Sequence, residues 1–231
     1  MLTDQEYKAI RREAEKRLRA GDLAGSLAIQ ESLVEQLMAG GPQLVQSQAA
    51  LTDQLERASG ELVDTLRWDR QFEKAIALQD RLVEYLPETA EALRVGAANL
   101  RIESGQAEAG LAQLEALAAA ETDNFWFQLS LGLGYLFVER LEEAGETLQR
   151  AAGLAHVRKV DRALAHQYLF KTLDLQGKPE EALAAWREAA RLDRKLRAEL
   201  PAVIRMLIYW HKFSMASDHI LMESDPVRSE F

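Results

Sequence analysis

The fold is decided by residues 131–152, which read LGLGYLFVERLEEAGETLQRAA. Two helical stretches follow one another here, and each sets a small residue, Gly132 or Ala144, among larger apolar residues at helical spacing. Ala144 has small counterparts elsewhere in the chain, at Ala75, Gly110 and Ala182. The steps between these four positions are 35, 34 and 38 residues. A period in this range indicates a solenoid of stacked helix pairs.

Apolar residues repeat with the same period. The matching positions are Leu82, Leu117, Ala151 and Ala189, with Leu114, Leu148 and Trp186 between them. Two helices cross closely only where small residues face each other, as we expect for Gly132 and Ala144. The large residues then fill the gaps between successive pairs.

The composition favours helices throughout the chain and excludes several classes of protein. Of the 231 residues, 48% are hydrophobic and only five are proline, which favours helix almost everywhere. No cysteine is present, so disulfides and thiolate metal sites are excluded. The net charge of −9 argues against a nucleic-acid binder. No apolar run is long enough for a membrane span, and the polar N-terminus carries no secretory signal. We expect an all-α, cytoplasmic protein.

The predicted organisation is a single repeat domain over residues 1–223 and a polar tail over 224–231. About five antiparallel helix pairs form a right-handed superhelical solenoid that ends in a C-terminal capping helix. The predicted segments are a degenerate first pair at 1–40, repeats at 42–87, 88–121, 123–155 and 161–200, and the capping helix at 201–223. Two departures from the period are predicted: an unusually long helix from Gln43 to Trp68, and extra residues near 155–161.

These residues resemble the tetratricopeptide repeat (TPR) family, whose pattern combines Leu-Gly, Tyr, a small residue and a closing Pro over two helices. The best copy is Leu131-Gly132, Tyr135, Leu141, Ala144, Leu148 and Ala151, and the next is Leu62, Leu66, Phe72, Ala75, Leu82 and Pro87. The resemblance implies a protein-binding surface, with the first helix of each pair lining a concave groove. One subset of the family clamps a terminal carboxylate with Lys and Asn. The corresponding slots here hold Arg11 and Glu15, so that specificity is not carried over.

The resemblance also implies which side chains line the groove. The candidates for partner binding are Arg11, Arg57, Arg67, Arg94, Arg101, Lys171, Trp126, Leu129, Leu133 and Phe137. The predicted charged positions are basic at Lys8, Arg11, Arg19, Arg57, Arg67, Arg94, Arg101 and Lys171, and acidic at Glu15, Asp64, Glu91 and Asp174. This basic excess in an acidic chain predicts a groove that binds an acidic segment or a carboxylate terminus. The alternative is that the bases are simply scattered over the surface.

The predicted helix over residues 124–139 is apolar on every face and should therefore be covered on every face. The cover is the helix carrying Leu164, the C-terminal helix, a second copy of the chain or a client helix. Either this helix or the C-terminal helix could also form the contact of a homo-oligomer.

No motif indicates catalysis, a cofactor or a metal site. The stretch 176–179, Gln-Gly-Lys-Pro, lacks the flanking residues of a phosphate-binding loop. His211 and His219 lie eight residues apart, and we expect them to be surface side chains rather than metal ligands. The leading hypothesis is a non-enzymatic scaffold or adaptor that binds a protein segment. The alternatives are an export or assembly chaperone that shields a client's hydrophobic helix, and a self-assembling structural repeat protein.

Overall fold

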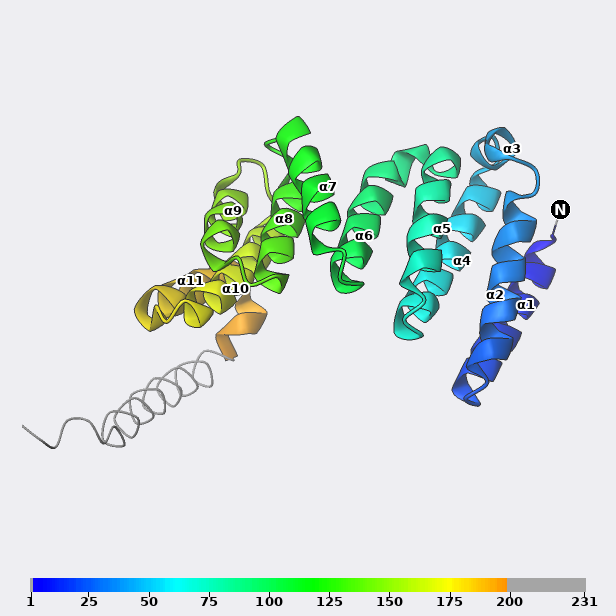
Figure 1. Ribbon diagram of the computed structural model, residues 1–231, viewed down its shortest axis with the longest axis horizontal. Helices are drawn as coiled ribbons and strands as arrows, with labels where there is room; N and C mark the ends of the chain where they lie inside the picture. The colour runs from blue at the N-terminus through cyan, green and yellow to red at the C-terminus, as the bar shows by residue number, and fades with distance from the viewer. Residues whose placement is uncertain (1, 199–231) are drawn as a thin grey trace, which may run out of the picture. The chain divides into compact units, whose positions relative to one another are not determined.

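The computed structural model describes residues 2–198, and in that part of the chain every regular element is a helix. Contacts between residues group the described part of the chain into two compact units, which divide after residue 116. Each unit is built from antiparallel helix pairs joined by short turns (Figure 1). The predicted capping helix over 201–223 lies outside the described residues, and the predicted repeat boundaries stay a prediction.

The first unit holds the N-terminal helices, the last of which runs a few residues past residue 116. They are α1 (Asp4–Arg19), α2 (Leu23–Met38), α3 (Pro42–Gln46), α4 (Ala49–Trp68), α5 (Phe72–Tyr85), the short 3₁₀ turn η1 (Pro87–Thr89), α6 (Ala90–Glu103) and α7 (Ala107–Ala120). Helix α1 begins with a capping box, in which Thr3 accepts a hydrogen bond from the backbone of Glu6 and Glu6 accepts one in return. Gly21, with φ of 81°, ends the α1–α2 turn.

The second unit holds the remaining helices. They are α8 (Phe125–Phe137), α9 (Leu141–Gly153), α10 (Lys159–Leu175), α11 (Pro179–Leu192) and the 3₁₀ turn η2 (Arg194–Ala198). The side chain of Asn124 caps α8 by accepting hydrogen bonds from two backbone amides. Gly177, with φ of 70°, and Pro179 make the turn into α11.

The cores consist of the predicted small and large repeat residues. Ala75, Ala144 and Ala182 are fully buried, and Leu82 and Leu148 are at most 1% exposed. Around them, one cluster in the first unit joins α1, α2, α4 and α5, and another in the second unit joins α10 to α11. The rows of small residues therefore allow the close helix approach that the pattern predicted.

The prediction of one long helix from Gln43 to Trp68 is wrong. The chain forms the short α3 and then leaves the helical conformation at Gln48, whose φ and ψ are −130° and 99°. At the break, the carbonyl of Val45 accepts hydrogen bonds from the backbone N–H of Gln48 at 3.1 Å and from the side chain of Thr52 at 2.8 Å. The break turns Val45 into the core, where it is fully buried.

Candidate functional site

A cleft of about 470 to 530 Å³ occurs in each unit, and the one in the first unit contains predicted groove residues. We call it the α1–α4 cleft, since α1 and α4 form its walls and α2 its floor. Its volume is about 530 Å³, and it is lined by Lys8, Arg11, Arg12, Glu15, Leu18, Gln30, Glu61, Asp64 and Thr65. The predicted positions Lys8, Arg11, Glu15 and Asp64 are thus brought together.

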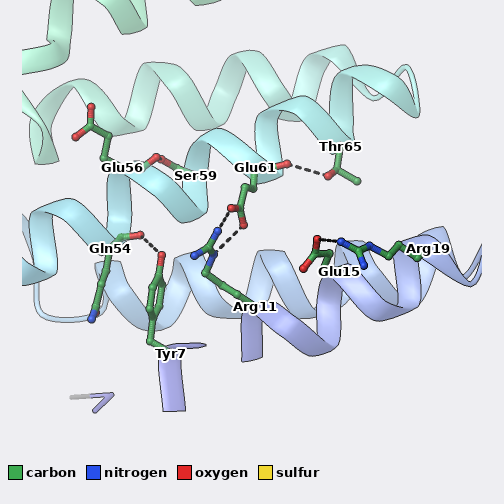
Figure 2. A network of polar contacts seen from close by, with 9 residues as sticks. All are labelled: Tyr7, Arg11, Glu15, Arg19, Gln54, Glu56, Ser59, Glu61 and Thr65. Atoms are coloured by element: carbon green, nitrogen blue, oxygen red, sulfur yellow. Dashed lines mark hydrogen bonds and ion pairs between the residues drawn. The ribbon is translucent and has the colours of Figure 1, made fainter. Parts of the chain in front are cut away.

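Arg11 and Glu61 join the two walls of the α1–α4 cleft (Figure 2). The Nε of Arg11 donates to Oε2 of Glu61 at 3.0 Å, and its second guanidinium nitrogen contacts the other carboxylate oxygen. The hydrogen bond that Arg11 donates to Glu61 raises the pKa of Arg11 above its ordinary value. The same guanidinium lies 5.5 Å from the ring centre of Tyr7, whose hydroxyl donates to the carbonyl of Gln54 at 3.2 Å.

Gln30 lies at the floor of the cleft with an unsatisfied carbonyl oxygen. The residue is only 8% exposed, and its buried Oε1 has no hydrogen-bond partner. One turn earlier on α2, the fully buried Ser26 donates to the carbonyl of Ala14 at 2.9 Å and holds α2 close to α1. A buried amide oxygen without a partner costs about 1–3 kcal/mol.

The charges of the cleft are balanced, with three basic and three acidic lining residues. Lys8 pairs with Asp4 at 2.6 Å, and Glu15 pairs with Arg19 at 2.5 Å on the same helix. Two charged lining residues, Arg12 and Asp64, are exposed and have no ion pair within the described residues. The cleft therefore offers one cation and one anion to a ligand.

The other predicted arginines divide into paired and exposed side chains. Arg67 of α4 makes two contacts of 2.6 Å with Glu103 of α6. Arg101 bonds Asp80 at 2.8 Å and Gln113 at 2.9 Å. Arg57 and Arg94 are exposed, and their side chains have no ion pair within residues 2–198. Three of the five predicted groove arginines in this unit are thus held by carboxylates of neighbouring helices.

In the second unit the predicted apolar residues of α8 are only partly covered. Leu129 is 3% exposed, and Leu133 packs in the same cluster as Leu164 of α10. Trp126 is 50% exposed and Phe137 is 61% exposed. Of the elements predicted to cover α8, the helix that carries Leu164, α10, packs against it. Lys171 of α10 is exposed and has no ion pair among the described side chains.

Sequence reasoning missed Gln30 and Arg12. Gln30 falls between Leu27 and Val34 on the inward-facing stripe of α2, and a polar residue at such a position signals either a buried hydrogen bond or a ligand contact. Arg12 has no such signal, because it lies between two other charged residues, Arg11 and Glu13, on a charged stretch of α1.

The described residues contain no group of three or more His, Asp or Glu side chains placed to hold a metal ion. Residues His211 and His219 lie outside the described residues. Within residues 2–198 no helix is both long and apolar enough to cross a bilayer.

No known protein family matches the sequence, and no curated protein matches it. Solved structures do match. One is a variant of the TPR-like repeats of a kinesin light chain described as putative, from Podosopora anserina, with a TM-score of 0.57 and 16% identity. The match covers 86% of this chain and 99% of that one. MamA from Desulfovibrio magneticus RS-1 matches with a TM-score of 0.51, 18% identity and coverage of 84% and 98% respectively. The chain therefore has the all-α fold of the TPR-like repeat proteins.

Proposed function

We propose that this chain is a non-enzymatic scaffold that binds an extended segment of a partner protein in the α1–α4 cleft. The observation that carries the proposal is Gln30, a residue that lines a cleft of about 530 Å³ and whose buried Oε1 has no hydrogen-bond partner. A backbone N–H of the partner is the donor that this oxygen needs. An extended segment offers such donors at regular spacing, whereas a folded surface does not.

The charges beside Gln30 set the chemistry of the segment. Arg12 is available to an acidic side chain, and Asp64 to a basic one. Arg57 and Arg94, which are also exposed on first helices, would extend the contact with an acidic partner along the unit. The proposed partner is therefore acidic, as predicted from the sequence, but it binds through the exposed arginines only. The paired arginines would have to break an ion pair before they could bind it.

Selection of peptides of about 12 residues on the full-length protein tests this proposal, followed by calorimetry with one selected peptide. Gln30→Leu removes the acceptor without changing charge, and Arg12→Glu reverses the exposed cation. We expect each to weaken binding about 10-fold or more, because a lost charge-assisted or buried hydrogen bond costs roughly 1.5–3 kcal/mol.

Lys16→Glu is the matched control, since Lys16 lies on α1, is exposed and does not line the cleft. The affinity of the Lys16→Glu variant for the peptide should stay close to that of wild type. If Lys16→Glu and Arg12→Glu weakened peptide binding equally and Gln30→Leu left it unchanged, peptide affinity would depend only on the net charge of the protein. The α1–α4 cleft would then be excluded as the binding site.

A second candidate function rests on the exposed face of α8. Trp126 and Phe137 are eleven residues apart, which is close to three helical turns, and both are at least half exposed. Such a face suits a client's hydrophobic helix or a second copy of the chain. Binding through this face should barely respond to salt, whereas binding through the charged α1–α4 cleft should weaken as salt rises. Light scattering over a dilution series separates self-association from client binding.

A further inference from the structure

A groove of about 470 Å³ in the second unit lies between α9 and α11, with α10 as its floor. We call it the α9–α11 groove. The residues that line it include Glu142, Glu146, Glu181 and Glu188 on the rims and Leu169 and Leu173 on the floor. Four of these residues are glutamates, and the two leucines make the floor apolar.

The first unit contains the equivalent groove, between α2 and α5 with α4 as its floor. The floor residues Leu62 and Leu66 precede Ala75 by the same number of residues as Leu169 and Leu173 precede Ala182. This α2–α5 groove is smaller, at about 320 Å³. One cause of the difference is that Leu78 on its rim is replaced by Ala185 in the second unit.

Ion pairs bridge the α2–α5 groove from rim to rim. Lys74 of α5 bonds Glu31 of α2 at 3.0 Å, and Arg81 bonds Glu35 at 2.7 Å. The pairing with Arg81 lowers the pKa of Glu35, which keeps that carboxylate charged. In the first unit the glutamates of α2 and the bases of α5 therefore neutralise each other.

The α9–α11 groove carries acids where the first unit has these bases. Lys74 lies one residue before Ala75 and Arg81 six residues after it, and the same positions relative to Ala182 are Glu181 and Glu188. The opposite rim adds two further acids, Glu142 and Glu146. Glu181 and Glu188 therefore cannot form rim-to-rim ion pairs with Glu142 and Glu146.

Most of this negative charge is not neutralised within the described residues. Glu142, Glu146 and Glu181 are exposed and have no ion pair there, and Glu188 pairs only with Arg191 of its own helix at 2.6 Å. Lys178, at the start of α11, is the one lysine or arginine that lines the groove. His166 adds little positive charge, since burial lowers its pKa, and its buried Nδ1 has no hydrogen-bond partner.

We propose that the α9–α11 groove binds a segment of a partner protein that presents Lys or Arg residues beside small apolar side chains. The partner's bases take the places that Lys74 and Arg81 occupy in the first unit, and its apolar side chains cover Leu169 and Leu173. A metal ion does not fit, because these carboxylates form no cluster able to hold one. The apolar floor selects a peptide over a simple polycation.

The test uses the full-length protein and a fluorescent amphipathic peptide of about 14 residues. In this peptide Lys or Arg recur at helical spacing, and Leu and Ala fill the positions between them. A peptide of the same composition with its bases and leucines in separate blocks controls for net charge. We expect the patterned peptide to bind at least about 10-fold more tightly than the block peptide, a difference of about 1.4 kcal/mol.

The double variant Glu181→Lys/Glu188→Arg installs the bases of the first unit and removes two of the four acids that line the groove. We expect patterned-peptide affinity to fall at least about 10-fold. Lys is compatible with the first turn of the helix at this position, because Lys74 occupies it in α5. The control Glu84→Lys/Glu88→Lys makes the same change of net charge at two exposed positions of the first unit and should retain binding.

Circular dichroism verifies that each variant keeps its helices. Equal affinity of the two peptides, or equal weakening by the groove variant and the control variant, would overturn the proposal. The reciprocal variant Lys74→Glu/Arg81→Glu opens the α2–α5 groove and should bind the patterned peptide more tightly than wild type does. No gain there would contradict the role assigned to rim charge.

Discussion

Arg11 of α1 and Glu61 of α4 are 50 residues apart in the sequence and form a two-point ion pair at the α1–α4 cleft. Arg67 and Glu103 repeat this arrangement between α4 and α6. The first helices of successive pairs are thus joined in order by an arginine on one helix and a glutamate on the next. These bridges fix the spacing of the walls before any partner binds.

A double-mutant cycle on Arg11→Ala and Glu61→Ala measures the strength of this bridge. We expect a coupling energy of about 1 kcal/mol, because the pair is bidentate and partly shielded from solvent. The same cycle on Lys8 and Asp4, an exposed pair within one helix, should give about 0.3 kcal/mol. Urea denaturation followed by circular dichroism supplies the free energies. Equal couplings would mean that the bridge adds nothing beyond a surface ion pair.

Two glycines inside helices should respond in opposite ways to alanine. A Cβ on Gly110 would lie 2.5 Å from the carbonyl oxygen of Ala98 and 2.6 Å from a side-chain carbon of Ile102. A Cβ on Gly60, in the middle of α4, meets nothing within 4 Å. We expect Gly110→Ala to destabilise the protein by about 1–3 kcal/mol. Gly60→Ala should stabilise it by about 0.5–1 kcal/mol.

The midpoints of urea denaturation compare the two glycine variants directly. Loss of stability in Gly60→Ala would show that α4 is more crowded at this position than the described contacts indicate. An unchanged Gly110→Ala would show that α6 and α7 move apart at little cost.

The repeat period sufficed to predict the helix pairs, because the small residues that allow close packing recur in the sequence itself. Ala75, Ala144 and Ala182 are all fully buried. Finer detail was harder to predict. Gly132 was expected to face Ala144, yet a Cβ there would first meet Leu148, one turn further along α9. The break at Gln48 also escaped prediction, because the apolar stripe continues past it and only the packing of Val45 requires a turn.

The candidate site was less predictable than the fold. The sequence indicated which arginines lie on first helices, but it did not indicate that carboxylates distant in the chain pair with three of them. Glu61, Glu103 and Asp80 face those arginines only after the helices have packed. Charge counted along single helices therefore overstated the basic excess of the groove.

Substitutions on α8 should separate its packed face from its exposed face. Leu129 is 3% exposed and packs in a cluster with α9 and α10, so Leu129→Ala should cost about 2–4 kcal/mol. Trp126 is half exposed, and Trp126→Ala should cost about 1 kcal/mol or less. Thermal and urea denaturation measure both changes. A loss of several kcal/mol in Trp126→Ala would mean that the indole is part of the core, which would exclude it as a free contact for a partner.

His166 should make the stability of the protein depend on pH. Burial lowers its pKa in the folded protein, with smaller influences from Glu188, Arg162 and Arg191. A histidine with a lowered folded pKa binds its proton more readily when unfolded. Its contribution to stability is therefore fully present above the unfolded pKa of about 6.5 and is lost as pH falls through it.

His166→Gln keeps a polar side chain but cannot titrate in this range. Urea denaturation at about pH 7.5 and about pH 5 should show a smaller loss of stability for this variant than for wild type. His156→Gln is the control, since His156 is exposed and its substitution should leave the wild-type loss unchanged. An identical loss in His166→Gln and wild type would show that other groups cause the acid sensitivity.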